Sequence, residues 1–217
     1  MFSSITIGDG GEFGTIALWQ QTRRNNIVDN KVNDELNLLS GTYNAGMLLW
    51  NWPTNEEFSA SVIIQAHPSA LHNGDWDSGV CLSGGTQNWK VQRNDINITY
   101  RDIVLKKAQV SIDQGNNYFG SMFGTGWDMS SVHHGKLTFD RCMVHTEGTP
   151  HTRIYYTSYV PSSSPSAFGT FEANYNNCVL EDTTGPVYPS KSVIEPAIAA
   201  SYGDHTYNFK GCTLVNQ

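Results

Sequence analysis

The stretch LTFDRCMVHT, residues 137–146, carries the pattern that decides the fold. It places an aromatic residue, two turn-prone residues, a cysteine and then an aliphatic residue in succession. The pattern returns as ANYNNCVLED at 173–182 and YNFKGCTLVN at 207–216, and more weakly as ITYRDIVLKK at 98–107. Self-similarity at a regular spacing is the signature of repeat architectures. The sequence therefore predicts a protein built from repeated structural units.

Aligning the four segments on their aromatic residues shows which positions share an environment. Alternate residues of a strand share a face, so an offset of three would turn the cysteine away from the aromatic unless the chain bends between them. We therefore predict a strand, a tight corner and a second strand in each repeat, with twelve side chains facing one interior. These residues are Tyr100, Ile103 and Leu105; Phe139, Cys142 and Val144; Tyr175, Cys178 and Leu180; and Phe209, Cys212 and Leu214.

The predicted corners are residue pairs that lie between the aromatic and the cysteine. Their second members are Asp102, Arg141, Asn177 and Gly211. Aspartate, asparagine and glycine tolerate the left-handed backbone of a sharp corner, whereas Arg141 fits this expectation poorly. The cysteine position recurs after 39, 36 and 34 residues, which is typical of solenoid coils that carry loops.

These segments resemble right-handed parallel β-helices of the pectate-lyase-like type, in which an aromatic, an asparagine corner and an inward cysteine or aliphatic recur. ITIGDGGEFGTIALWQQ, residues 5–21, resembles the strand, glycine-rich turn and short helix that open many such proteins. VIIQAHPSALHNGDWDSGVCL, residues 62–82, resembles early coils of related phage and bacterial β-helices. The resemblance implies an all-β, single-stranded right-handed parallel β-helix. It does not fix an activity, because this fold includes enzymes, adhesins and inert virion parts.

One domain is expected over residues 1–217. Residues 1–30 would form a strand and a capping helix, and residues 31–217 would form coils with insertions at 115–134, 148–170 and 183–203. We expect the helix over 16–24, with Thr15 as its N-cap and basic residues at its C-terminal end. It would cover the open edge of the first coil. Further strands are predicted at 35–39, 46–50, 61–65, 80–82 and 89–92. Inside the second insertion, RIYYTSYV at 153–160 is predicted to be a strand followed by a flexible loop.

Composition excludes several classes of function. The chain has 217 residues, a formal charge of −7 and no basic cluster, which argues against nucleic-acid binding. No apolar run approaches the roughly 18 residues of a membrane span. The N-terminus lacks a basic segment followed by an apolar one, so no secretory signal peptide is expected. The four cysteines are accordingly predicted to be reduced thiols.

Three chemical interpretations of the sequence, a dinucleotide loop, a zinc site and a set of disulfides, are weaker than their structural alternatives. The run GDGGEFG at 8–14 has Phe13 where a dinucleotide loop needs its third glycine, so we expect a turn into the helix. Cys142 and His145 would point to opposite faces of a strand, so they and His151 do not make a zinc site. Stacked cysteines have parallel Cβ vectors, which favours a reduced ladder over disulfides. No cofactor or metal is predicted.

Cleavage of a sugar chain needs a pair of carboxylates. Asp140 and Glu172 could face one groove, whereas Glu181 and Asp182 are expected at the solvated surface; no catalytic residue can be assigned. Several aromatics, Trp76 among them, could stack on sugar rings or bury a subunit interface. The candidate interface residues lie in the insertions: Tyr118, Phe119, Trp127, Tyr155, Tyr156 and Tyr159.

The resemblance and the short chain favour a bacteriophage virion structural protein. The expectation is a homotrimeric capsid decoration or cement protein that stabilises the head, contacts the major capsid protein and enters the virion after assembly in the host cytoplasm. With about six to eight coils at typical solenoid periods, the chain is shorter than depolymerising spikes of this fold. The alternative is a tailspike-like or fibre β-helix that binds host surface polysaccharide or cleaves it as a lyase or hydrolase.

Overall fold

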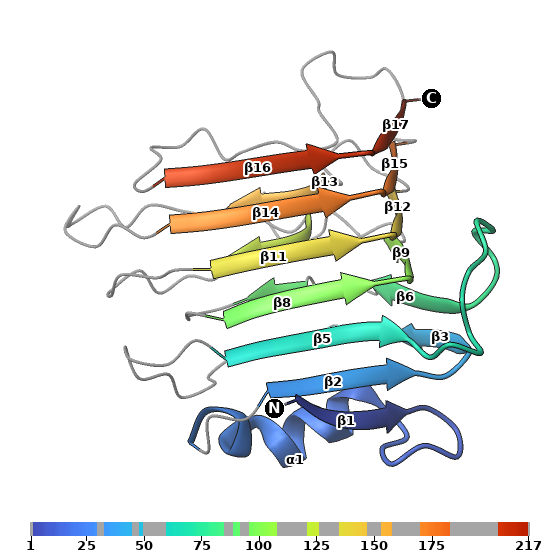
Figure 1. Cartoon of the computed structure of the whole chain (residues 1–217), viewed down its shortest axis with the longest axis vertical. Helices are drawn as coiled ribbons and strands as arrows, with labels where there is room; N and C mark the ends of the chain where they lie inside the picture. Colours follow the sequence, from blue (N-terminus) through green and yellow to red (C-terminus); the bar gives the residue numbers. More distant parts are fainter. Residues whose placement is uncertain are drawn as a thin grey trace, which may run out of the picture.

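Parallel strands stacked in three sheets make up most of the computed structural model (Figure 1). The structure describes residues 2–29, 33–44, 48–49, 60–84, 89–91, 96–107, 121–125, 135–146, 153–157, 170–182 and 204–216. The seven-stranded sheet contains, in spatial order, β1 (Phe2–Ile7), β2 (Asn33–Leu38), β5 (Ala60–Ala66), β8 (Ile96–Arg101), β11 (Gly135–Asp140), β14 (Thr170–Asn176) and β16 (Asp204–Lys210).

The other two sheets repeat this order. The six-stranded sheet contains β3 (Gly41–Asn44), β6 (Val80–Gly84), β9 (Val104–Lys107), β12 (Met143–Thr146), β15 (Val179–Asp182) and β17 (Thr213–Asn216). The four-stranded sheet contains β4 (Leu48–Leu49), β7 (Trp89–Val91), β10 (Ser121–Thr125) and β13 (Arg153–Thr157). Neighbours in each sheet therefore come from successive passes of the chain. The described residues form a mostly β structure with one helix, consistent with the predicted all-β parallel solenoid.

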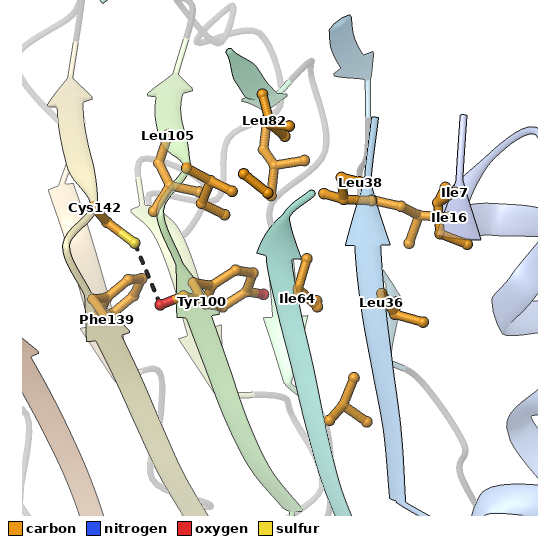
Figure 2. Packing of buried hydrophobic residues seen from close by; sticks show 14 of the residues in the cluster. Ile7, Ile16, Leu36, Leu38, Ile64, Leu82, Tyr100, Leu105, Phe139 and Cys142 are labelled. Atoms are coloured by element: carbon orange, nitrogen blue, oxygen red, sulfur yellow. Dashed lines mark hydrogen bonds between the residues drawn. The ribbon is translucent and has the colours of Figure 1, made fainter. Parts of the chain in front are cut away.

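The aromatic row of the sequence repeat is aligned inside the seven-stranded sheet. The strand register places Phe139 beside both Tyr100 and Tyr175, and Tyr175 beside Phe209. Successive rings are nearly parallel, with centroids 5.5, 4.9 and 5.0 Å apart. Figure 2 shows the row continuing from Tyr100 into earlier coils, to the right in this view, through Ile64 and Leu36. This offset arrangement is one of the preferred geometries for aromatic pairs and fills the interior of the stack.

The cysteines form a second inward row at the corner. The Sγ atoms of Cys142 and Cys178 lie 3.4 and 3.5 Å from the carbonyl oxygens of Tyr100 and Phe139, one coil earlier. Cys212 repeats the contact at 3.2 Å from the Tyr175 carbonyl oxygen. All four cysteines of the chain are free. Burial raises the pKa of the Cys142 thiol, which keeps the proton that this S–H···O contact requires.

All four predicted corner residues have a left-handed backbone. The φ angles are 56° at Asp102, 52° at Arg141, 53° at Asn177 and 65° at Gly211. The corners also stack, because the N–H groups of Asp102, Arg141 and Asn177 each donate to a carbonyl one coil later, at 2.7–3.0 Å. The corner therefore forms at Arg141 although arginine disfavours this backbone conformation, because contacts with neighbouring coils hold it there.

Helix α1 (Ile16–Asp29) covers the first coil, as predicted (Figure 1). The backbone N–H of Leu18 donates to Thr15 Oγ1 at 3.2 Å, which confirms the N-cap. Ile16 and Trp19 are buried in the main core cluster. The predicted helix end is wrong: the helix continues to Asp29, and its last turn contains no basic residue. Arg23 instead pairs with the buried Asp34, which also accepts a hydrogen bond from Trp19 Nε1 at 2.8 Å.

Several strand boundaries and two insertions differ from the prediction. Of the strand expected at 46–50, the structure describes Leu48–Leu49, which lie in a strand, and Gly41–Asn44 was not predicted. The segments 115–134 and 148–170, predicted as insertions, contain β10 and β13 of the four-stranded sheet. A strand was expected at 153–160, and β13 confirms its first part. The strand β10 was missed because it lies in glycine- and aromatic-rich sequence without the aromatic-corner-cysteine pattern. The segment 183–203 lies outside the described residues.

The last coil keeps the register of the ladder but not its burial. Phe209 and Leu214 align with Tyr175 and Leu180, yet they are 46% and 64% exposed. Cys212 is only partly buried. The predicted core therefore holds for the nine residues of the three earlier coils, all of which are buried. At the last coil the same positions form an exposed apolar end.

Candidate functional site

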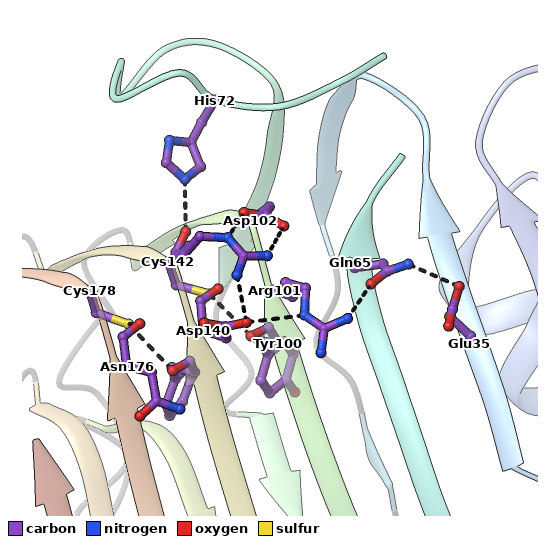
Figure 3. A network of polar contacts seen from close by, with 12 residues as sticks. Glu35, Gln65, His72, Tyr100, Arg101, Asp102, Asp140, Cys142, Asn176 and Cys178 are labelled. Carbon is purple, nitrogen blue, oxygen red and sulfur yellow. Dashed lines mark hydrogen bonds and ion pairs between the residues drawn. The ribbon is translucent and has the colours of Figure 1, made fainter. Parts of the chain in front are cut away.

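Charged side chains at the corner bind one another across coils (Figure 3). The Arg141 guanidinium donates to both carboxylate oxygens of Asp102 at 2.7 Å and to Asp140 Oδ2 at 2.9 Å. Arg101 donates to the same Asp140 oxygen at 3.2 Å and to Gln65 Oε1 at 3.0 Å. The hydrogen bonds to Asp102 raise the pKa of Arg141, so this guanidinium stays charged. The network ties successive coils together.

The two acids proposed for one groove lie on the same outer face but far apart. Glu172 is opposite Lys136 in the register, and Asp140 lies four residues beyond Lys136 on the same strand. Four residues span about 13 Å of strand, beyond the roughly 5–10 Å of a glycosidase carboxylate pair. Hydrogen bonds from Asn174 and then Lys136 lower the pKa of Glu172, which favours its ionised form. These two residues do not form a general acid–base pair.

A different polar cluster forms where the loop 67–79 meets the outer face of the six-stranded sheet. His145 Nδ1 donates to Glu181 Oε2 at 2.8 Å, with both side chains mostly buried. The ring of Trp76 lies 5.4 Å from the His145 ring, at a tilt of 56°. Beside them, Lys106 Nζ lies 2.6 Å from Asp77 Oδ1 and lowers the pKa of that carboxyl. An indole, a histidine, two acids and an amine therefore gather here.

Local hydrogen bonds fix the loop that brings Trp76 and Asp77 to this face. The N–H of Gly74 donates to His72 Nδ1 at 3.0 Å, so the other ring nitrogen, Nε2, carries the proton. That nitrogen donates to the Arg141 carbonyl at 2.9 Å, which fastens the loop to a later coil. Asn73 and Gly74 have positive φ angles of 51° and 82° and supply the sharp turn. Hydrogen bonds and turn residues of its own therefore hold the loop in place.

Sequence reasoning did not find this cluster. Glu181 was expected at the solvated surface, but its side chain is only 12% exposed and pairs with His145. The residues are distant in sequence and match no compact motif. A signal was nevertheless present, because His145 and Glu181 follow Cys142 and Cys178 by the same three residues. Equivalent positions of successive coils stack, and here they place a base beside an acid.

The structure decides some of the other predicted sites. Cys142 is buried inside the stack and His145 pairs on the outer face, so they do lie on opposite faces; His151 lies outside the described residues. No group of three or more His, Cys, Asp or Glu in the described ranges could hold a metal ion. The glycine-rich run 8–14 is a turn closed by its own backbone, with Gly8 N–H donating to the Phe13 carbonyl at 2.9 Å.

The predicted interface aromatics are not placed by the described part of the chain. Tyr155 and Tyr156 belong to β13, which pairs with β10, but their side chains are not among those described. The remaining predicted interface residues fall outside the described ranges: Tyr118, Phe119, Trp127 and Tyr159. Within those ranges, no helix has the length and apolar character needed to cross a bilayer.

The chain matches no protein-family model, no curated protein and no solved structure significantly. Its function must therefore be argued from the geometry.

Proposed function

We propose that the chain forms a closed right-handed parallel β-helix and serves as a structural protein of a bacteriophage virion. The specific proposal is a homotrimer that binds the outside of the capsid and stabilises the head. Its lateral contacts would involve the aromatic segments 115–134 and 148–170, and its partner would be the major capsid protein. Local three-fold axes of a capsid lattice match a trimer by symmetry.

The observation that carries this proposal is that Asp102, Asp140 and Glu172 on the outer faces are all paired with basic side chains. Asp140 is held by two arginines, Asp102 by Arg141 and Glu172 by Lys136. Three of these pairs join successive coils: Arg101 with Asp140, Arg141 with Asp102, and Lys136 with Glu172. The fourth, between the adjacent residues Asp140 and Arg141, lies within one coil. Pairs of this kind stiffen a stack, whereas an acid that cleaves a glycosidic bond must face the substrate. The described outer faces therefore favour a structural role.

Copy number in purified particles tests the proposal directly. Quantitative mass spectrometry of virions should give a number that matches the three-fold positions of the capsid lattice. Light scattering on the isolated protein should give a mass that is a multiple of three chains. A few copies confined to the tail, or a mass incompatible with trimers, would contradict the capsid proposal. Release of sugar products from host polysaccharide, abolished by changing one acid, would replace it with an enzymatic function.

One observation favours the second candidate, a tailspike-like protein that binds host glycan. Trp76 is only partly buried, its ring lies beside that of His145, which pairs with Glu181, and the next residue is the exposed Asp77. An indole face with adjacent acids suits a sugar ring, which offers an apolar face and a rim of hydroxyls. Host polysaccharide should then quench tryptophan fluorescence, and Trp76→Ala should abolish the quenching. Unchanged quenching in Trp76→Ala would exclude this position.

A further inference from the structure

The two ends of the strand stack differ. At the N-terminal end, α1 lies across the first coil, and its Ile16 and Trp19 join the core (Figure 1). At the opposite end, β16 and β17 are the last strands of their sheets, and no described strand pairs with either on the outer side. Phe209 and Leu214, which occupy core positions in the register, are exposed there. An open strand edge over an exposed apolar row is a template for pairing with another chain.

Symmetry restricts how a second copy could use this edge. Head-to-tail stacking would bring the open end of one copy against the first coil of the next, where α1 lies. End-to-end pairing avoids the helix, because each copy contributes the same open edge. A two-fold axis through the contact makes the two strands antiparallel. The inner faces of the two strands then lie on the same side of the extended sheet.

The sequence of β16 is self-complementary in this arrangement. The strand begins at Asp204 and ends at Lys210. In an antiparallel pair centred on Tyr207, all seven residues find an opposite residue. Asp204 of one copy then lies opposite Lys210 of the other, and the contact occurs twice. Any other register pairs fewer residues and separates these opposite charges.

We propose that the C-terminal end of the solenoid is a two-fold interface between copies of this chain, formed by antiparallel pairing of β16. The contact extends the seven-stranded sheet across the axis and covers Phe209. It uses the end of the solenoid, whereas the proposed trimer uses its sides, so neither contact depends on the other. With both present, the assembly contains six chains in dihedral symmetry.

Charge-swap variants test the pairing. Lys210→Asp places an aspartate opposite Asp204 twice, and Asp204→Lys places a lysine opposite Lys210 twice. Each single variant should lose the even-numbered assembly in multi-angle light scattering, by at least a tenfold weaker association. The double variant Asp204→Lys/Lys210→Asp restores opposite charges at the native net charge and should recover the assembly. Asp9→Lys, in the exposed turn at the other end, is the control and should associate like the native chain.

The outcomes separate this inference from the proposed function. A native mass of two or six chains that the single variants reduce by half, and the double variant restores, supports the interface. A native mass of three chains that no variant changes overturns it and leaves the proposed trimer intact. A native monomer overturns both. A double variant that folds, by circular dichroism, but remains as dissociated as the single variants also overturns the β16 pairing.

Discussion

Phe139 and Phe209 occupy equivalent positions in the aromatic row, but alanine at each should have a different cost. Phe139 is fully buried, and its ring stacks on Tyr100 at 5.5 Å and on Tyr175 at 4.9 Å. Truncation of a buried phenylalanine costs about 3–5 kcal/mol, including the cavity left behind. Phe209 is already 46% exposed, so scaling by buried area gives about 1.5–2.5 kcal/mol.

Urea unfolding followed by far-UV circular dichroism can measure this difference of about 2 kcal/mol between the two alanine variants. The protein should be dilute, so that contacts between copies do not contribute. At high concentration the cost of Phe209→Ala should rise, because the proposed interface covers that ring. Equal losses of stability for both variants in dilute solution would refute the reasoning, since they would mean that the last coil is as well packed as the interior.

Three further predictions concern buried polar chemistry. Cys178→Asp puts an unpaired carboxylate into the thiol row and should cost about 3 kcal/mol or more, whereas Cys178→Val should cost less than about 1.5 kcal/mol; melting within a degree of the native protein would place Cys178 outside. Asp34→Ala leaves the Arg23 guanidinium without its buried partner and should lower the free energy of unfolding by about 3–5 kcal/mol; an unchanged urea midpoint would contradict this. Burial raises the pKa of the Cys142 thiol above its ordinary 9.0, so as pH rises the unfolded chain loses this proton before the folded chain does. The protonated thiol therefore contributes fully to the free energy of unfolding below about pH 9, and this contribution falls as the pH rises further. Urea midpoints at pH 7, 9 and 10 should show this decline, and Cys142→Val should reduce it; an identical decline in that variant would exclude the thiol.

The sequence predicts the later coils well because their repeat is chemically distinctive. Tyr100, Phe139 and Tyr175 mark the inward row, and a cysteine after a corner marks the next strand. The earlier coils use Leu36 and Ile64 at the same register positions. An isolated leucine or isoleucine does not reveal its register, so only the stacking shows that these residues continue the row.

Features that depend on contacts between coils were the hardest to predict. Intrinsic backbone preference disfavours Arg141 at a left-handed corner, but its ion pairs with Asp102 and Asp140 offset that preference. Similarly, His145 and Glu181 look like surface residues until two coils are stacked. The exposure of Phe209 was missed for the opposite reason: a repeat pattern describes a residue as if another coil always followed.

The stacked register has a consequence for how such a chain can change in length. Each coil, or rung, of the stack aligns only with the coils directly before and after it. Cys142 and Cys178 occupy equivalent positions in successive coils, 36 residues apart. Deleting one residue within a strand would exchange its inner and outer faces. Deleting or duplicating the whole segment between two such cysteines would leave every remaining rung with an equivalent neighbour. Duplication of a coil is therefore a route by which this molecule can become taller while keeping the structures at both ends.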